Sequence, residues 1–283
     1  MQDTGQQKAL LIVGPKRSGK GTIARLIAKL VGAGNVVGPT TSSLAGAFGL
    51  APLVGKSVAI VSDARFAGDN ISVVVERLLC ITGEDALSVE RKYLGAVNMT
   101  LPTRFVFLTN ELPRMTDASG ALAGRFMILR LRESFYGRED PTLTAQLQAE
   151  LPGILKWAIE GLKRLRRRGH FVQPRSVAND IRDLEDLASP VGAFVREQCR
   201  VGKDQYGDLA RISVARLYIE FTNWCVAEGR NAIPSKQVFG RDLAAAVPGV
   251  RRRRTTKQTR FYEGVTIDGH EFTTAANEQE LDE

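Results

Sequence analysis

A glycine-rich segment near the amino terminus constrains the fold of this chain more than any other feature. Residues 14–22 follow an apolar run at 9–13 and precede a stretch, 22–30, whose apolar side chains recur with helical spacing. Glycines in such a turn let successive backbone N–H groups point inward around an anion, and the amino end of the next helix adds partial positive charge. The segment therefore predicts a strand, a phosphate-binding loop and a helix. The residues of the loop are Gly14, Pro15, Lys16, Arg17, Ser18, Gly19, Lys20, Gly21 and Thr22.

The lysine of this loop predicts binding of ATP, because its ammonium group can bind the β and γ phosphates. The next position usually carries the Ser or Thr ligand of Mg²⁺, but here it is Gly21, and the hydroxyl comes one residue later at Thr22. Nucleotide binding is still predicted despite this departure, but the assignment of Thr22 as the Mg²⁺ ligand is weaker. The same Gly-Lys-Gly-Thr order occurs in adenylate-kinase-like enzymes, so the loop alone does not define the reaction.

The first half of the chain alternates β-rich runs with helical patterns. Apolar runs at 58–61, 105–108 and 126–131 predict further strands, and 71–81 predicts a helix. Such alternation is typical of an α/β domain with a central parallel sheet. Residues 143–168 have helical periodicity and end in a basic run before Gly169, which suits a helix carboxyl cap. The apolar side chains expected on one face of that helix are Ile154, Ala158, Leu162 and Leu165.

Polar side chains that could take part in catalysis follow or precede these strands. Asp63 ends the second strand, as a Mg²⁺-binding acid does in many ATPases, and Asn110 ends the third, where it could orient water against the γ-phosphate. Arg125 precedes the fourth strand and could stabilise charge in a neighbouring subunit, although Arg130 is a rival for that role. Asp63 stands between Ser62 and Ala64, so the sequence leaves open whether it is the metal ligand or the catalytic base.

The order of these motifs resembles that of superfamily 3 helicases. Residues 83–93, between the Asp63 and Asn110 strands, resemble the B′ motif of that superfamily. More closely, over residues 10–171 the chain resembles the helicase part of phage and plasmid primase–helicases and of poxvirus-type primase–helicases. The resemblance implies an AAA+-type P-loop NTPase domain, taken here as 1–172, that hydrolyses ATP with Mg²⁺ in a ring, normally a hexamer.

Roles follow from the resemblance at matching positions. Lys20 resembles the phosphate-binding lysine, Asn110 the sensor-1 residue and Arg125 the finger that acts on the neighbouring subunit. The adjacent Arg91, Lys92 and Tyr93 resemble the hairpin that contacts single-stranded or forked DNA, for which a cation beside an aromatic ring is suited. The chain begins close to the phosphate-loop strand, without the primase domain and the amino-terminal helical collar of the family. It is expected to be either a fragment of a larger primase–helicase or the product of a split gene, with a primase in trans as one possible partner.

The carboxyl-terminal third predicts a helical connector at 173–190 and a winged-helix-like domain at 191–268. Helices are expected at 191–199, 213–228 and 235–246, followed by a basic strand pair, with Phe221 and Trp224 in the core. A disordered acidic tail is expected at 269–283. Such a domain either binds DNA or docks proteins. The DNA-binding side chains would be those of Lys236, Arg251, Arg252, Arg253 and Arg254.

Composition is compatible with this interpretation. The 283 residues carry a net charge of +8, which favours a polyanion as partner without defining it. The cysteines are far apart and predict free thiols, and no stretch is apolar enough for a signal peptide or a membrane span, so a cytoplasmic protein is expected. The main hypothesis is an ATP-driven DNA helicase that translocates on DNA in phage, plasmid or mobile-element replication. The alternatives are an ATP-switched DNA-binding loader with weak hydrolysis and, third, a nucleotide kinase.

Overall fold

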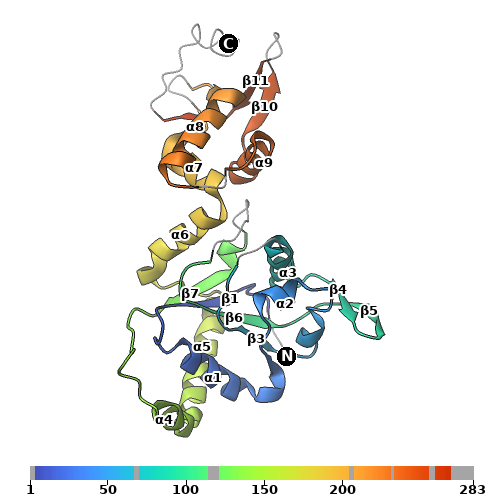
Figure 1. Cartoon of the computed structure of the whole chain (residues 1–283), viewed down its shortest axis with the longest axis vertical. Helices are drawn as coiled ribbons and strands as arrows, with labels where there is room; N and C mark the ends of the chain where they lie inside the picture. Colours follow the sequence, from blue (N-terminus) through green and yellow to red (C-terminus); the bar gives the residue numbers. More distant parts are fainter. Residues whose placement is uncertain are drawn as a thin grey trace. The chain divides into compact units, whose positions relative to one another are not determined.

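The computed structural model describes residues 4–66, 70–113, 121–203, 207–230, 233–254 and 259–268. The chain divides into two compact units, with the boundary along the chain between Leu184 and Glu185 (Figure 1). None of the helices in these ranges is both long and apolar enough to span a membrane. The tail expected to be disordered, 269–283, lies outside the described residues.

The first unit is built on a parallel sheet. Its described strands form a five-stranded sheet in the order β2-β3-β6-β1-β7, and every neighbouring pair in it is parallel. The α/β architecture with a central parallel sheet is therefore confirmed. The strands are β1 (Ala9–Val13), β2 (Val36–Val37), β3 (Val58–Val61), β6 (Arg104–Thr109) and β7 (Phe126–Arg130).

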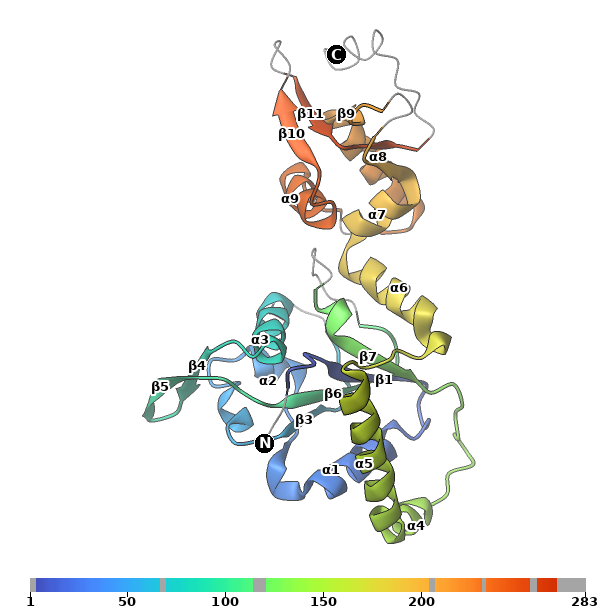
Figure 2. The ribbon, with the colours of Figure 1, turned by 180° about the vertical axis from the view of Figure 1, so that it is seen from behind.

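Both faces of this sheet are covered, which explains why its strands are almost continuously apolar. Alternate residues along each strand enter different cores. On one face Leu11, Ala59 and Phe107 belong to the larger core, whereas Ile12 and Val106 face the helix that follows β1. Figure 2 shows α2 (Thr41–Ala45) and α3 (Ile71–Gly83) on one side of the sheet and α1 (Lys20–Val31) and α5 (Leu151–Arg168) on the other. The sheet is thus a rigid frame whose strand ends position the loops.

The predicted helices of the first unit are present, but a short helix at Thr41–Ala45 was not predicted, and the region after residue 143 differs. There the expected single helical region is two helices, α4 and α5, which meet at Glu150. Pro152 near the start of α5 lacks a backbone N–H, so it fits a first helical turn and not a helix interior. Gly169 caps α5 in the left-handed conformation, as predicted. The helices are α1 (Lys20–Val31), α2 (Thr41–Ala45), α3 (Ile71–Gly83), α4 (Leu143–Ala149), α5 (Leu151–Arg168) and α6 (Ala178–Ala188), the last of which crosses the boundary between the units.

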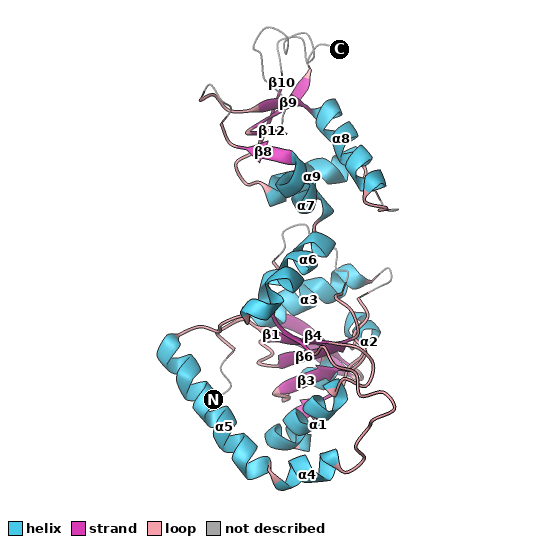
Figure 3. Ribbon diagram, turned by 90° about the vertical axis from the view of Figure 1, so that its left-hand side faces the viewer, coloured by secondary structure: helices cyan, strands magenta, loops and turns pink. Residues whose placement is uncertain are grey.

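The apolar face expected on α5 is only partly covered. Ile154 and Leu165 are half-buried, but Leu162 is exposed, as are Leu155 and Ile159 beside it. Figure 3 shows α5 as a long helix at the margin of the first unit. Helical periodicity predicted the helix correctly and overestimated its burial.

The second unit contains α7 (Pro190–Gln198), α8 (Val214–Ala227) and α9 (Lys236–Ala246), followed by a basic strand pair as predicted. Strands β10 (Arg251–Arg254), β11 (Arg260–Glu263) and β9 (Arg211–Ser213) form an antiparallel sheet in the order β10-β11-β9. A second pair joins β8 (Cys199–Val201) to β12 (Val265–Ile267). Neither β8 nor β9 was predicted, because each is only three residues long.

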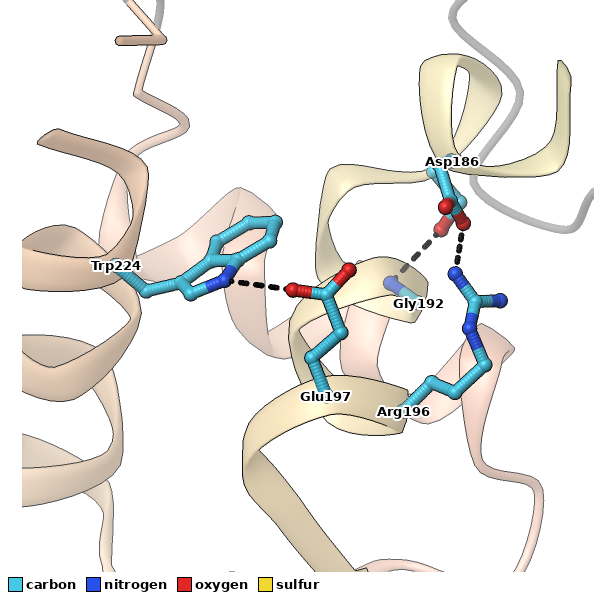
Figure 4. Close-up of polar contacts among 6 residues, drawn as sticks. Asp186, Gly192, Arg196, Glu197 and Trp224 are labelled. Carbon is cyan, nitrogen blue, oxygen red and sulfur yellow. Dashed lines mark hydrogen bonds and ion pairs between the residues drawn. The ribbon is translucent and has the colours of Figure 1, made fainter. Parts of the chain in front are cut away.

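Aromatic side chains form the core of this unit. Phe221 is fully buried and Trp224 nearly so, which confirms their predicted core role. The ring of Phe221 lies 4.7 Å from that of Phe239, centroid to centroid. The indole Nε1 of Trp224 donates a hydrogen bond of 3.1 Å to Glu197 Oε2 (Figure 4). Arg196, next to Glu197, pairs with Asp186, so charged groups fasten the end of α6 to α7.

The three cysteines are free thiols, as predicted. Burial, with a smaller contribution from the charge of Asp268, raises the pKa of Cys199 to about 12. Burial also raises the pKa of Cys80 and of Cys225. All three side chains are therefore protonated and poorly nucleophilic at neutral pH.

Candidate functional site

The phosphate-loop candidate connects β1 to α1, as the sequence predicted. Gly14 has no space for a side chain, because an added Cβ would lie 2.8 Å from Leu131 O and 2.9 Å from Ser18 Oγ. Its backbone N–H donates to Thr109 O at 3.2 Å, which fixes the start of the loop against β6. Gly19, just before the helix, has a φ of 90°, a left-handed conformation that glycine adopts without strain. The two glycines thus have separate roles, one in packing and the other in turning the chain.

The ammonium group of Lys20 lies within this loop. Its Nζ donates to Gly14 O at 2.6 Å, to Pro15 O at 2.7 Å and to Ser18 Oγ at 3.3 Å. Desolvation by burial lowers the pKa of Lys20, and the nearby charge of Asp63 opposes that shift. The loop therefore carries a partly desolvated cation, whose attraction to an anion is stronger than that of a fully hydrated one.

Thr22 lies in the first turn of α1, with its hydroxyl paired to its own helix. Thr22 Oγ1 accepts a 3.1 Å hydrogen bond from Arg25 Nη2. Gly21 between Lys20 and Thr22 is exposed, and a Cβ at that position would lie 3.3 Å from Arg25 Nη1. The arginine thus occupies the space beside the glycine that replaces the usual hydroxyl residue.

The sheet order brings the polar strand ends to the edge where the phosphate loop lies. Because β6 is hydrogen-bonded to both β1 and β3, Asn110 is located between the loop and Asp63 along this edge. Neighbouring strands are about 4.8 Å apart, so the three strand ends fall within about 10 Å. Asn110 is exposed, and Asp63 pairs with Arg65 at 3.1 Å. Asp63 has a φ of 54°, a conformation that Asp tolerates better than most residues.

Two oxygen groups of this edge could hold a metal ion, the Thr22 hydroxyl and the Asp63 carboxylate. They are hard donors of the kind that Mg²⁺ prefers when phosphate oxygens and water complete its octahedron. Among the described residues no cluster of three or more His, Cys, Asp or Glu side chains could hold a metal alone. The donor set therefore fits Mg²⁺ that arrives with a nucleotide, and does not fit a metal bound by protein groups only.

Arg125 lies at the opposite edge of the sheet. In the parallel register of β1 and β7, Ala9 is opposite Phe126 and Val13 is opposite Arg130. Arg125 is therefore one strand length, about 16 Å, from the edge that carries Lys20. Its Nη1 donates to the side-chain oxygen of Gln7 and, at 3.4 Å, to Thr82 O. Arg125 cannot reach the phosphate loop of the same chain.

Arg130, the rival of Arg125, lies at the phosphate-loop edge and is held there by an acid. Its Nη2 pairs with Asp180 of α6, and the Asp180 side chain is 12% exposed. The Nε of Arg130 is buried and has no hydrogen-bond partner among the described residues. Within the chain this arginine fastens the carboxyl end of β7 to α6.

This pair gives a prediction about stability. Asp180→Ala would leave the Arg130 guanidinium partly buried without its acid, so we expect the free energy of unfolding to fall by about 1–3 kcal/mol. Urea denaturation followed by circular dichroism measures this change. Asp183→Ala is the matched control, because Asp183 is exposed on the same helix and we expect it to change stability little. Equal stability of the two variants would contradict the assigned role of the pair.

The segment that resembled a B′ motif, 83–93, forms the first strand and the turn of an antiparallel hairpin of β4 (Leu87–Arg91) and β5 (Leu94–Met99). Its turn carries Tyr93, which is 101% exposed and has a φ of 62°. Lys92 Nζ lies 5.9 Å above the ring of Phe48, and Arg91 Nη2 donates to Gly95 O at 3.1 Å. Arg91 therefore supports the turn, while Lys92 and Tyr93 are the exposed pair.

The basic candidates of the second unit lie on its surface. Lys236 begins α9 and is exposed, and the Arg251–Arg254 side chains of β10 are all exposed. A cavity of about 600 Å³ is lined by Arg252, Arg253, Arg254 and Arg260. Arg260 belongs to β11 and was not among the predicted residues. The antiparallel register places it opposite Arg254, and this pairing across strands was the signal that sequence reasoning missed.

Comparison with known proteins supports the fold and leaves the activity open. Residues 12–125 match a family of unknown function, DUF5906. The structure is similar to that of the NrS-1 C terminal region, with a TM-score of 0.52 and 12% identity, over 92% of this chain and 67% of that chain. A second apo structure of that region gives a TM-score of 0.51 with 13% identity over the same shares. A structure of JCV helicase matches with a TM-score of 0.37 at 19% identity, over 64% of this chain and 51% of that one. At these identities the similarity shows a shared fold.

Proposed function

We propose that this chain is the motor of a DNA-translocating ATPase of the superfamily 3 type, which binds ATP and Mg²⁺ and acts as a ring. One observation carries the proposal. The loop 14–22, Asp63 and Asn110 share one edge of the parallel sheet, whereas Arg125 lies at the other edge. Such a division suits an enzyme whose active site is completed by a second subunit.

The proposed chemistry assigns one task to each group. Backbone N–H groups of the loop and Lys20 hold the β and γ phosphates, and Asn110 orients water toward the γ-phosphorus. Attack forms a bond from the water oxygen to that phosphorus and breaks its bond to the bridging oxygen, giving ADP and phosphate. Thr22 and Asp63 would hold Mg²⁺, which neutralises charge on the phosphate oxygens. The alternative role of Asp63, in place of binding the metal, is that of the base for the water proton.

The proposed ring uses a head-to-tail interface. A subunit contacts its neighbour through different surfaces on its two sides, and such contacts close into a ring when the rotation between subunits is suitable. The Arg125 edge of one subunit would face the phosphate-loop edge of the next. A hexamer is the expected size because of the resemblance to superfamily 3 helicases, and a primase acting in trans remains part of the same hypothesis.

For DNA, the hairpin and the second unit have different proposed tasks. Lys92 can neutralise a phosphate of a single strand while Tyr93 stacks on a base or packs on a sugar. The second unit is proposed to be a winged helix, with α9 presenting Lys236 to a groove and β10 placing Arg251–Arg254 along the phosphates. The order α7, α8, α9 and then β10–β11 supports this assignment.

The decisive measurement is ATP turnover with and without single-stranded DNA. The motor hypothesis expects turnover that DNA stimulates. Tight ATP binding without turnover would instead favour a DNA-binding loader switched by ATP. Formation of ADP from AMP and ATP would favour a nucleotide kinase, the third hypothesis.

The hairpin gives a more specific prediction. Tyr93→Ala should raise the DNA concentration needed for half-maximal stimulation about 5-fold to 100-fold, because a base stacked on an aromatic ring contributes about 1–3 kcal/mol. Turnover without DNA should not change. Asn98→Ala, an exposed position on the same hairpin away from its turn, is the matched control. DNA stimulation that is identical in both variants would exclude Tyr93 from DNA contact.

A further inference from the structure

The segment that leaves β7 returns to the phosphate loop and is fastened to it. Ser134 Oγ donates to Lys16 O at 2.9 Å, and the backbone N–H of Phe135 donates to Arg17 O at 3.1 Å. Arg17 Nε also pairs with Glu139 Oε1 at 3.4 Å. We call residues 134–139 the aromatic turn. Three contacts thus hold the aromatic turn against the outer part of the loop.

Within the aromatic turn the backbone conformation is fixed. Arg138 N donates to Phe135 O at 2.8 Å, and Gly137 has a φ of 75°. A glycine at the third position of a four-residue turn supplies the positive φ that a type II turn requires. Tyr136 therefore stands at the tip. The guanidinium carbon of Arg138 lies 5.9 Å from the centroid of the Phe135 ring and Arg138 Nη2 donates to Ser134 O at 3.1 Å, which restrains that ring.

The two rings of the aromatic turn are exposed although the segment is well anchored. Phe135 is 47% exposed and Tyr136 is 76% exposed. Leaving these rings partly in water forgoes a share of the about 1.5–3 kcal/mol that full burial of a large apolar side chain contributes. A rigid turn that presents them beside an anion-binding loop therefore suggests a ligand with both a phosphate group and a flat apolar group.

We propose that Phe135 and Tyr136 form the stacking surface for the purine base of the nucleoside triphosphate held by the phosphate loop. This inference rests on the proposed nucleotide binding at 14–22. The loop recognises phosphates through backbone N–H groups and Lys20 and so does not distinguish one base from another. A purine has a larger π-face than a pyrimidine, so stacking on these rings gives preference for ATP and GTP over CTP and UTP. The aromatic turn supplies selectivity that the loop lacks.

The test separates the base from the phosphates. We expect Tyr136→Ala and Phe135→Ala each to weaken ATP binding about 5-fold to 100-fold, as loss of base stacking does. Binding of inorganic tripolyphosphate, which has no base, should not change in either variant. Isothermal titration calorimetry of the whole chain measures both ligands. Tyr136→Phe keeps the ring and should keep the affinity for ATP, and Trp157→Ala, an exposed aromatic residue on α5, is the matched control.

The kinetic result should match the binding result. If the turn acts through the base, Tyr136→Ala raises the KM for ATP and leaves kcat unchanged, because the base is bound equally in the ground state and the transition state. A double variant that combines Phe135→Ala with Tyr136→Ala removes both rings, and unchanged ATP affinity in this double variant would overturn the proposal. An equal loss of affinity for tripolyphosphate would also overturn it, since that result would mean a disturbed phosphate loop.

Failure of this inference can be distinguished from failure of the proposed function. Lys20→Ala should weaken both ATP and tripolyphosphate. If it does, and the double variant of the aromatic turn still binds ATP normally, only the stacking surface is wrong. If Lys20→Ala changes neither ligand, the proposed nucleotide site itself is wrong, and the stacking surface fails with it.

Discussion

Replacing Arg125 with alanine is expected to lower the turnover of ATP by about 10³-fold to 10⁵-fold, the range found for arginine fingers, while ATP still binds. The reason is geometric. Arg125 lies at the sheet edge opposite its own phosphate loop, so its guanidinium can stabilise transition-state charge only in the site of a neighbour. The hydrogen bonds from Nη1 to Gln7 and Thr82 hold one side of the guanidinium in its own subunit.

The sharpest measurement mixes two inactive variants. Consider a ring assembled from Arg125→Ala and Lys20→Ala subunits. An interface in it has both functional side chains only where an Arg125→Ala subunit provides the phosphate loop and a Lys20→Ala subunit provides the arginine. Random mixing in equal amounts makes about one quarter of the interfaces intact in a head-to-tail ring. Recovery of turnover on mixing would establish action between subunits. Arg130→Ala is the control arginine, and recovery obtained with Arg130→Ala instead of Arg125→Ala would transfer the role to Arg130. Normal ATP turnover in the Arg125→Ala variant alone would exclude Arg125 as the arginine finger.

Lys20→Ala is the second large effect, with an expected loss of about 100-fold to 1000-fold in turnover, as for removal of a charged or hydrogen-bonding group that stabilises the transition state. Lys20 is partly desolvated within the loop, which strengthens its attraction to phosphate oxygens. Unlike Arg125→Ala, this variant should also lose affinity for ATP. Lys29→Ala is the matched control, because Lys29 is an exposed lysine in the last turn of the same helix. Turnover within a few-fold of the unaltered chain would rule out the proposed site.

Much of the fold was predictable because its strands are buried on both faces. Strands with that burial are short and continuously apolar, and the sequence contains these runs at 9–13, 58–61, 105–108 and 126–131. The location of Asp63 and Asn110 at the same edge of the sheet was also predictable from the sequence, because the carboxyl ends of parallel strands lie at one edge. The roles of these side chains are still predictions, because no observation of the molecule tests them.

Other features gave no local signal. Strand β2 has only two residues and no periodicity, and α2 depends on a capping box between Thr40 and Ser43 that sequence reasoning overlooked. The aromatic turn escaped notice because its position depends on contacts with Lys16 and Arg17, more than a hundred residues earlier. The exposed side of α5 was missed because periodicity shows that a helix has an apolar face and says nothing of how much surface is available to cover it.

The conformation of Tyr93 has a consequence for the evolution and engineering of this protein. A bulky residue at a φ of 62° has a conformational cost of about 1–3 kcal/mol that glycine would avoid. Substitution by glycine would therefore make the hairpin more stable and at the same time remove its exposed ring. Selection for thermal stability alone would favour that change. Engineering of this chain for stability alone would therefore remove the side chain that is proposed to contact DNA. The tip of the hairpin is a place where stability and activity favour different residues.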